Sequence, residues 1–245
     1  MKVVFLGATK GMGRALARLM AARGDQLFLL GRDPGDLQRS ARDLEIAGAA
    51  GAVGTAYCDL LQPDSFGPAL DEAARRLDGF DTVVVTAGLF ASQEELENDP
   101  ELRQRLLTAD FVNTVAFCEH ARTRLLSRGG GTLCVFSSVA GERARKPVIF
   151  YGAAKAGLSY YLDGLDHKYR DQGLNTIAVK PGFVKTAMTA GLDPPPFAGE
   201  PDPVARVVLA AIDRRQPTVF APKIWRWVML VIRNLPRAVM RRIQF

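Results

Sequence analysis

Short apolar runs alternate along this chain with longer segments in which apolar residues recur at helical spacing. The apolar runs lie at residues 2–7, 26–31, 54–60, 81–88, 131–138 and 174–182. Helical spacing follows the first three of them, at residues 12–24, 34–48 and 64–79. Because the runs are apolar almost throughout rather than alternating, they are typical of strands buried on both faces. The succession predicts βαβ units and hence a parallel sheet.

The predicted fold class is α/β, a three-layer, doubly wound parallel sheet of the Rossmann type in a single domain, with amphipathic helices at its C-terminus. Helices are expected to stop at Gly24, Gly79 and Gly173, because each follows a periodic stretch. The proline-rich residues 193–203 predict a loop or mobile lid rather than a domain boundary. We therefore expect one domain over residues 1–222, followed by a basic amphipathic segment over residues 223–245.

The composition narrows the class of protein. Of 245 residues, 48% are hydrophobic and 24% are charged, which excludes a disordered, collagen-like or disulfide-scaffold chain. Cys58, Cys118 and Cys134 lack CxxC spacing, so we interpret them as small hydrophobic residues in a reducing compartment. With 2 histidines in the chain, no metal site is expected. The first predicted strand begins at residue 2 with no apolar signal segment before it, which predicts a cytoplasmic location.

The net charge of +6 is concentrated at the C-terminus. Residues 223–245 contain no acidic residue and the following basic ones: Lys223, Arg226, Arg233, Arg237, Arg241 and Arg242. Residues 1–222 are then balanced, with 26 basic and 26 acidic side chains. This distribution indicates one basic appendage rather than a nucleic-acid-binding surface.

Glycines follow the first predicted strand and precede a predicted helix. Gly7, Gly11 and Gly13 have GxxxGxG spacing there. Glycines in this context let the backbone turn tightly and approach a pyrophosphate, whose charge lies at the helix N-terminus. The pattern predicts a dinucleotide site, and the alternative is a tight turn with a purely structural role.

The end of the second predicted strand bears on the choice of nucleotide. An acidic residue at this point binds the adenosine ribose, whereas a basic one accepts a 2′-phosphate. The strand ends in Gly31 and Arg32, and Lys10 adds a cation from the glycine loop. This favours NADP(H) over NAD(H). The alternative is that Arg32 is a solvated loop charge, and the neighbouring Asp33 keeps NAD(H) open.

A tyrosine and a lysine four residues apart open another helical segment. Tyr151 and Lys155 therefore share one helix face, where the ammonium can favour the phenolate of a group whose ordinary pKa is about 10. Upstream, a buried strand ends in Ser137 and Ser138, which places hydroxyls at the carboxyl edge of the sheet. A YxxxK pattern alone is common on protein surfaces. It indicates a catalytic site here because it occurs together with the glycine loop and the serine pair.

In this order, the motifs resemble those of the short-chain dehydrogenase/reductase family over residues 2 to about 220. The matching segments are GATKGMG at 7–13, CDL at 58–60, TAG at 86–88, DFVNTVA at 110–116, SSVAG at 137–141, YGAAK at 151–155 and PGFVKT at 181–186. The chain departs from the family pattern at Leu6, where threonine is usual, and at Thr86, where asparagine is usual. Both positions support the cofactor loop and the sheet rather than the chemistry.

The resemblance implies a catalytic tetrad. Tyr151 would be the general acid/base, Ser138 would hydrogen-bond the substrate oxygen, and Lys155 would hold the nicotinamide ribose and lower the tyrosine pKa. Asn113 would anchor a water that links Lys155 to solvent. Of the two serines, Ser138 has the family's spacing to Tyr151, and Ser137 then points to the opposite face. The implied cofactor contacts are Gly7, Thr9, Lys10, Gly11, Met12, Gly13, Arg32, Asp59, Leu60, Ala87, Gly88, Tyr151, Lys155, Pro181, Gly182, Val184 and Thr186.

Three cations, Arg143, Arg145 and Lys146, lie in the loop between Ser138 and Tyr151. A cationic loop at the mouth of a site favours an anionic substrate such as a phosphate or phosphodiester, and the alternative is a solvated loop with no substrate role. Residues 141–158 and 220–242 also resemble one branch of the family, the reductase partner of the decaprenylphospho-ribose 2-epimerase of mycobacterial-type wall synthesis. That resemblance implies a 2-keto pentose linked to polyprenyl phosphate as substrate.

The apolar stretch within residues 223–245 is too short to span a membrane. As a helix they place apolar residues 228–232 opposite one basic arc, with Trp225 and Trp227 at the flank and a second helix starting at Pro236. The arc comprises Lys223, Arg226, Arg233, Arg237 and Arg241. We expect peripheral contact with the inner face of the cell membrane, and subunit packing is the alternative.

The sequence predicts an NADPH-dependent oxidoreductase that reduces a carbonyl on a small-molecule or lipid-linked substrate. It also predicts a homo-oligomer with no nucleic-acid partner. A second hypothesis keeps the chemistry and changes the substrate to a long-chain 3-keto lipid or acyl thioester. A third is a scaffold that binds NADP(H) without catalysis, against which the intact tetrad argues.

Overall fold

The fold is built on one sheet of parallel strands. A computed structural model describes residues 1–243. The strands are β1 (Lys2–Leu6), β2 (Gln26–Gly31), β3 (Gly54–Tyr57), β4 (Thr82–Val85), β5 (Gly131–Phe136), β6 (Leu174–Pro181) and β7 (Thr218–Ala221). Their spatial order is β3-β2-β1-β4-β5-β6-β7, and every neighbouring pair is parallel. The predicted doubly wound sheet is confirmed, and its order reverses between β1 and β4, where open sheets of this kind bind ligands.

Helices connect successive strands. They are α1 (Gly11–Ala22), α2 (Pro34–Ile46), α3 (Phe66–Leu77), α4 (Gln93–Asn98), α5 (Pro100–Leu107), α6 (Asn113–Ser127), α7 (Ile149–Tyr169), α8 (Pro201–Asp213), α9 (Trp225–Asn234) and α10 (Arg237–Arg242). A π-helical turn, η2 (Thr108–Val112), joins α5 to α6. Gly24 and Gly79 follow α1 and α3 at positive φ, and Gly173 does so after the 3₁₀ turn that ends α7. The predicted helix ends are confirmed.

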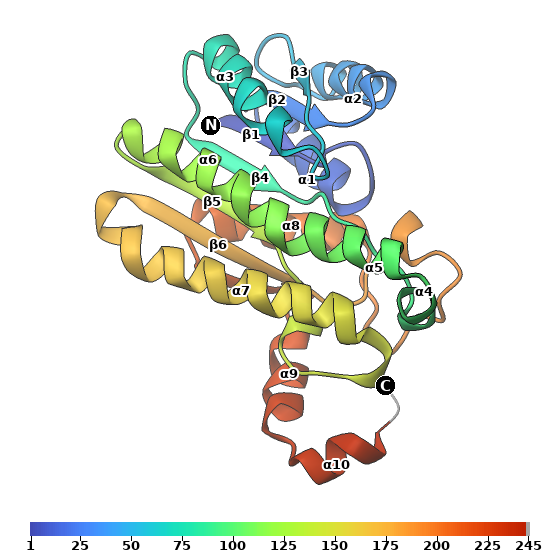
Figure 1. The fold of residues 1–245 in the computed structure, drawn as a ribbon. Helices are drawn as coiled ribbons and strands as arrows, with labels where there is room; N and C mark the ends of the chain where they lie inside the picture. The colour runs from blue at the N-terminus through green and yellow to red at the C-terminus, as the bar shows by residue number, and fades with distance from the viewer. Residues whose placement is uncertain (244–245) are drawn as a thin grey trace.

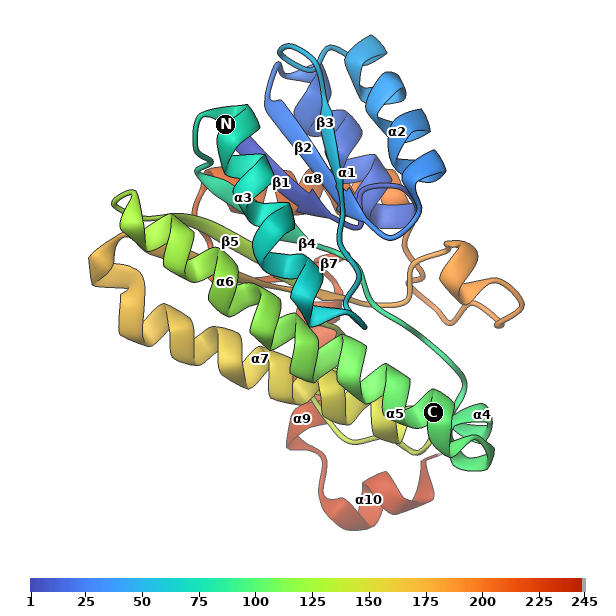
Figure 2. The same cartoon turned by 45° about the horizontal axis from the view of Figure 1, so that its top comes forward.

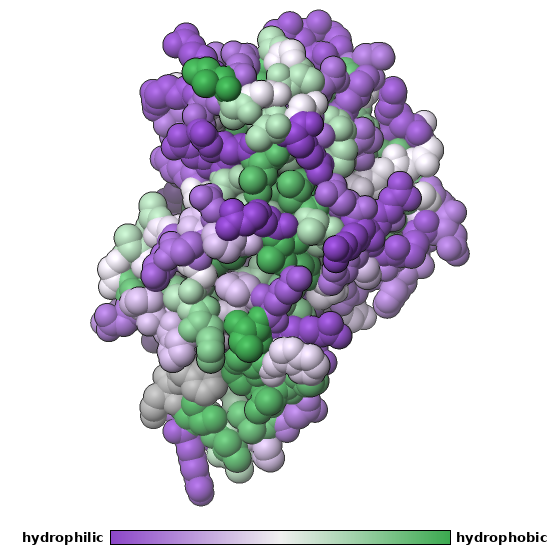
Figure 3. All heavy atoms as spheres, turned by 180° about the vertical axis from the view of Figure 1, so that it is seen from behind, coloured by the Kyte–Doolittle hydropathy of each residue, from purple (hydrophilic) through white to green (hydrophobic). Residues whose placement is uncertain are grey.

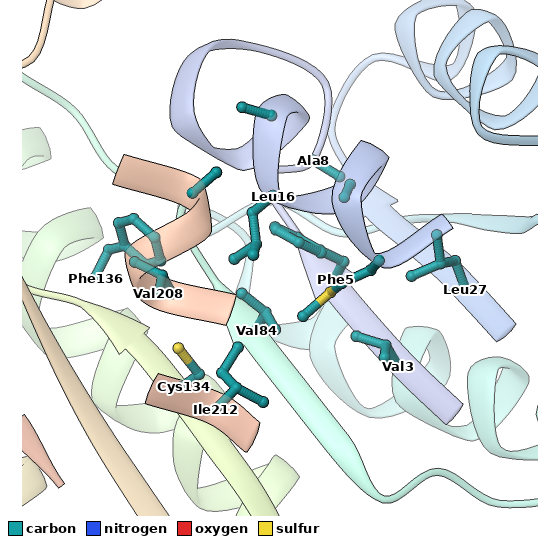
Figure 4. Close-up of a cluster of buried hydrophobic side chains, with 14 of the residues drawn as sticks. Val3, Phe5, Ala8, Leu16, Leu27, Val84, Cys134, Phe136, Val208 and Ile212 are labelled. Atoms are coloured by element: carbon teal, nitrogen blue, oxygen red, sulfur yellow. The ribbon is translucent and has the colours of Figure 1, made fainter. Parts of the chain in front are cut away.

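Alternate residues of each strand divide the core into two layers (Figures 1 and 2). Val3 and Phe5 of β1 face α1 and α8, in the cluster that Figure 4 shows around Leu16, Val208 and Ile212. The intervening residues of β1 face α3, α6 and α7 on the other side of the sheet. Burial on both faces explains why the strands are apolar almost throughout.

Two segments differ from the sequence expectation. The strand β7 was not predicted, because its four residues carry too little pattern to distinguish them from a loop. The proline-rich loop is confirmed as far as Glu200, but Pro201 begins α8, since proline is well accommodated in a first helical turn. The cysteines are free and buried, as expected of small hydrophobic residues.

The C-terminal segment packs against the domain beyond the carboxyl ends of the strands (Figure 2). Trp225, Met229 and Ile232 of α9 are buried around Val139. Trp225 was expected at the flank of the apolar face, and is instead an anchor of the segment. The predicted second helix is confirmed as α10, with Pro236 at its N-cap. Within residues 1–243, no helix combines the length and the apolar character that crossing a membrane requires.

Candidate active site

The glycine loop is held by close backbone contacts. A Cβ on Gly13 would lie 2.2 Å from the carbonyl oxygen of Gly7 and 2.5 Å from Oγ1 of Thr86, so only glycine fits. Gly7 itself adopts φ of 98°, in the left-handed region. The Thr86 hydroxyl donates a 2.9 Å hydrogen bond to the Gly7 carbonyl and ties β4 to the loop. This contact gives the departure at Thr86 a structural role.

A cavity of about 310 Å³ lies above the loop, between the carboxyl ends of β1, β2 and β4. Twelve of the predicted cofactor residues line it: Gly7, Thr9, Lys10, Gly11, Met12, Gly13, Arg32, Asp59, Leu60, Ala87, Gly88 and Thr186. Its lining also includes residues that the sequence did not single out, among them Leu61, Leu89, Ala109 and Met188. The cavity wall is largely apolar, and its polar side chains are Thr9, Lys10, Arg32, Asp59, Thr86 and Thr186.

The residues present fit a dinucleotide. Lys10 is the N-cap of α1 and makes no side-chain capping hydrogen bond, and the first turn contains no acidic residue. The amide groups at this helix end therefore face the cavity as donors for an anion. Glycine at positions 7 and 13 lets the backbone approach closely. A pyrophosphate matches both features.

The other predicted cofactor residues lie outside the lining. Pro181 ends β6, and Val184 is buried and bridges to Gly199. Gly182 lies under the Trp225 ring, because a Cβ at this position would be 2.0 Å from the indole nitrogen. The close approach of α9 thus accounts for this glycine, and its predicted contact with a cofactor stays a prediction. Tyr151 and Lys155 lie on α7, beside the cavity.

Several charged side chains lie at the adenosine end of the cavity, and Lys10 and Asp36 among them form an ion pair. Arg32 is exposed and lines the cavity. Asp33 is the N-cap of α2, and its carboxylate accepts a 2.8 Å hydrogen bond from the Asp36 amide. Lys10 Nζ lies 3.1 Å from Asp36, and its hydrogen bond, followed by that of Arg39, lowers the pKa of that carboxyl. Asp33 is therefore committed to capping a helix.

Tyr151 and Lys155 lie on the first two turns of α7. The Lys155 ammonium is 5.6 Å from the centre of the Tyr151 ring. Ser138 lowers the pKa of the phenol, and its Oγ accepts a 3.1 Å hydrogen bond from the Ala140 amide. The Ser137 hydroxyl instead donates to the Lys155 carbonyl at 2.9 Å and lies 2.7 Å from the Ser159 hydroxyl. The structure thus brings together Ser138, Tyr151 and Lys155. Ser137 fastens β5 to α7 on the opposite side, as its alternation with Ser138 predicts.

The Tyr151 phenol is controlled by burial and by two charges. Burial raises its pKa, Lys155 lowers it, Asp110 raises it, and Ser138 lowers it, with a net direction upward from the usual value. Lys155 thus lowers the phenol pKa in the predicted direction, but burial raises that pKa by more. Phe90 packs edge-on against the phenol ring at 5.2 Å and helps to exclude water from it.

Asn113, the fourth predicted member, is buried at the start of α6. Its side-chain amide donates a 2.6 Å hydrogen bond to the Leu60 carbonyl, which links α6 to the loop after β3. Lys155 instead contacts Asp110, at 3.2 Å, and the Phe136 carbonyl, at 3.4 Å. Asp110 was not among the predicted site residues. Its only sequence signal is an acidic residue inside an otherwise apolar helical stretch, three positions before Asn113.

The predicted cationic loop contacts the C-terminal segment through one of its three cations and through the neighbouring Glu142. Arg143 donates to the Leu235 carbonyl at 2.8 Å, and Glu142 pairs with Lys180 at 2.7 Å and Arg233 at 3.0 Å. Arg145 differs, because its Nε is buried with no hydrogen-bond partner among the described residues. Burial lowers the pKa of this guanidinium. The loop is therefore neither wholly solvated nor wholly directed at the site.

Known proteins resemble this chain in sequence and in fold. The sequence model described as short chain dehydrogenase matches residues 1–195. An uncharacterized oxidoreductase of Mycobacterium tuberculosis is 33% identical over 240 residues, which cover 98% of this chain and 96% of the relative. A short-chain dehydrogenase from Sphingobium yanoikuyae, solved in complex with NADPH, superposes with a TM-score of 0.81 at 26% identity and covers 99% of this chain and 96% of that one. A short-chain type dehydrogenase/reductase from Mycobacterium ulcerans shares the fold, with a TM-score of 0.81 at 21% identity over 89% of this chain and 86% of that one.

Proposed function

Because this chain belongs to the short chain dehydrogenase family, and is thus an NAD(P)-dependent oxidoreductase, we propose that it reduces a carbonyl group with NADPH. The observation that carries the proposal is the cluster of Ser138, Tyr151 and Lys155 beside a cavity fitted to a dinucleotide. Nucleotide binding alone would not require a half-buried phenol, a buried lysine and a buried hydroxyl together at that edge of the sheet.

Each residue of the cluster has a separate task. Bound NADPH would supply the hydride that the carbonyl carbon receives. The Tyr151 phenol donates its proton to the carbonyl oxygen, while the Ser138 hydroxyl orients that oxygen by a hydrogen bond. Lys155 stabilises the phenolate that remains until a proton returns from solvent. The task of Asn113 as a water anchor stays a prediction, since its side-chain amide is committed to Leu60.

The preference for NADPH over NADH rests on the adenosine end of the cavity. Arg32 is free to turn its planar guanidinium toward a 2′-phosphate. Asp33, the residue that could favour NADH, caps α2 instead. Lys10 now pairs with Asp36 at 3.1 Å, and it can bind the same 2′-phosphate if that ion pair opens. The NADPH complex of the Sphingobium yanoikuyae protein supports the same choice.

We assign the substrate to the class of carbonyl compounds that carry an anionic group. Arg145 lies in the loop between Ser138 and Tyr151, and its buried Nε lacks an acceptor among the described residues. Buried donors are normally satisfied, so a substrate phosphate or phosphodiester would complete this site. A 2-keto sugar on a polyprenyl phosphate fits this class. Arg145→Met should raise KM for such a substrate while leaving KM for an uncharged ketone unchanged; equal effects on both would contradict the assignment.

The outer side of the C-terminal helices is suited to a membrane surface. Trp227 and Val231 of α9 are 61% and 64% exposed, with Leu230 between them. Apolar side chains gather at this end of the molecule in Figure 3. The same two helices carry exposed basic side chains: Arg226, Arg233, Arg237, Arg241 and Arg242. We infer that a cytoplasmic enzyme contacts an anionic leaflet here, where a lipid-linked substrate would be presented.

Cosedimentation with phosphatidylglycerol vesicles tests the membrane contact. Wild-type protein should pellet with these vesicles, and the double variant Trp227→Glu/Val231→Glu should stay in the supernatant. Ile46→Glu is the matched control, because Ile46 is 88% exposed on α2, away from this end. Wild-type protein that never pellets would contradict the contact. If the double variant instead converts an oligomer to monomers, the surface joins subunits, which would give the predicted homo-oligomer its interface.

Tyr151→Phe tests the catalytic proposal. This variant removes the proton donor and keeps the ring, so kcat should fall by ~10²–10⁴-fold while NADPH binding stays near normal. Tyr160→Phe is the control, since Tyr160 lies on the same helix and is 85% exposed. Full turnover by Tyr151→Phe would show that another group supplies the proton.

A further inference from the structure

A buried carboxylate lies behind the candidate catalytic lysine. Asp110 belongs to the π-helical turn η2, and its side chain is fully buried. One carboxylate oxygen accepts a 2.6 Å hydrogen bond from the Leu89 amide, in the segment after β4 that lines the cavity. Gly88 leaves the room for it, because a Cβ there would lie 3.1 Å from the same oxygen. Single π-turns within helices often occur at functional sites.

The second carboxylate oxygen is directed at Lys155. Oδ2 lies 3.2 Å from Nζ, and the two side chains are 0% and 6% exposed. The ammonium also donates to the Phe136 carbonyl, at 3.4 Å. Burying an ammonium is costly without a counter-charge, and the Asp110 carboxylate supplies one. Burial lowers the pKa of the lysine, but Asp110 and the Tyr151 phenol raise it, with a net direction upward, so Lys155 is protonated.

We propose that Asp110 is a positioning residue, which holds the Lys155 ammonium in place and offsets part of its charge beside the Tyr151 phenol. The inference rests on the proposed function and adds to it a residue outside the predicted tetrad. Asp110 accepts a hydrogen bond from the Leu89 amide and forms an ion pair with Lys155. Its charge also acts on the Tyr151 phenol at longer range. Without the Asp110 carboxylate, the Lys155 ammonium would lower the pKa of the Tyr151 phenol further.

Among the charged groups around α7, Asp110 and Lys155 are the two that shift the pKa of the Tyr151 phenol. Burial raises the pKa of Tyr151, Lys155 lowers it, and Asp110 raises it. On neighbouring elements, Arg103 of α5 stacks on Phe150 at 5.3 Å, and Glu142 after Val139 is paired with Lys180. Lys146 lies in the short turn that precedes α7.

The sign of the effect follows from the charges. Reduction needs protonated Tyr151, so its rate should fall as pH rises through the phenol pKa. Asp110→Asn removes a negative charge and stabilises the phenolate, so this fall should occur at lower pH. In the direction of alcohol oxidation the phenolate is the base, and the rise in rate should also move to lower pH. A merely structural defect would lower both profiles without moving them along the pH axis.

The test titrates the phenol in cofactor-free protein, using ¹³C-labelled tyrosine and NMR, with the Tyr151 signal assigned from Tyr151→Phe. The midpoint should fall by about one pH unit in Asp110→Asn, the size expected for loss of one nearby charge. Asp110→Glu should restore it toward the wild-type value. Asp110→Ser serves as a second neutral variant, in case the asparagine folds poorly.

An unchanged midpoint in the folded neutral variants would overturn the inference. Failure of the proposed function looks different. In that case wild-type protein would not oxidise NADPH with any carbonyl, while the Tyr151 midpoint could still move in Asp110→Asn. Exposed Asp64→Asn is the control for removal of a surface charge, and it should leave the midpoint unchanged.

Discussion

Gly13→Ala is the substitution that most directly tests the cofactor loop. The new Cβ would lie 2.2 Å from the Gly7 carbonyl oxygen and 2.5 Å from the Thr86 hydroxyl. Both atoms belong to one hydrogen bond of 2.9 Å, so neither can move without breaking the link between β4 and the loop. Relief of the contact requires α1 to shift by about 1 Å, a misplacement that can cost ~100-fold in a positioned site.

We therefore expect the Kd for NADPH to rise by at least ~100-fold, which corresponds to about 2.7 kcal/mol. Overpacking should also lower the free energy of unfolding by ~1–3 kcal/mol. Nucleotide fluorescence titration measures the first quantity and urea denaturation the second. Gly164→Ala is the matched control: it lies in α7 with open space around its Cβ position, so it should gain up to ~1 kcal/mol of stability and keep its affinity. A folded Gly13→Ala variant with wild-type NADPH affinity would refute this account of the loop.

Three further substitutions test other parts of the structure. Arg32→Ser should weaken NADPH binding by ~10–100-fold through loss of charge-assisted hydrogen bonds, and leave NADH binding unchanged; steady-state KM values for the two nucleotides check this. Glu142→Gln should loosen α9 at neutral pH, as reported by tryptophan fluorescence. Burial raises the pKa of Glu142, but Lys180 and Arg233 lower it by more, so its net direction is downward. Wild-type protein should therefore keep this contact above the ordinary glutamate pKa of about 4.3 and lose it as pH falls through the lower folded pKa. Trp225→Ala should cost ~3–5 kcal/mol by leaving a cavity over Gly182, measured by urea denaturation.

Much of the fold could be predicted because its signals are local. The apolar runs of β1, β2 and β6 need two buried faces, and that requirement is visible in each run separately. The glycines of the loop also carry their reason in the spacing. In contrast, β7 is a strand only because it pairs with β6, a contact between residues about 40 positions apart that no local pattern reports.

The candidate site was predictable for the same reason, and only in part. Tyr151 and Lys155 share a helix face, so their proximity follows from helical geometry. Asp110 meets Lys155 through a π-turn and a long-range packing of α6 against α7, neither of which the spacing of residues encodes. In the C-terminal segment, periodicity predicted amphipathic helices but could not show which apolar residues face the domain. The structure buries Trp225 and exposes Trp227, two positions apart.

Transfer of deuterium from NADPH labelled at the nicotinamide C4 position tests the central claim most directly. Wild-type protein on phosphatidylglycerol vesicles would be given a 2-keto sugar linked to polyprenyl phosphate and, separately, a long-chain 3-keto lipid. The account predicts one deuterium on the former carbonyl carbon of the sugar product, detected by mass spectrometry, and none with Tyr151→Phe. Transfer to the keto lipid alone would contradict the assigned substrate class. NADPH binding without transfer to either compound would contradict both proposed substrates.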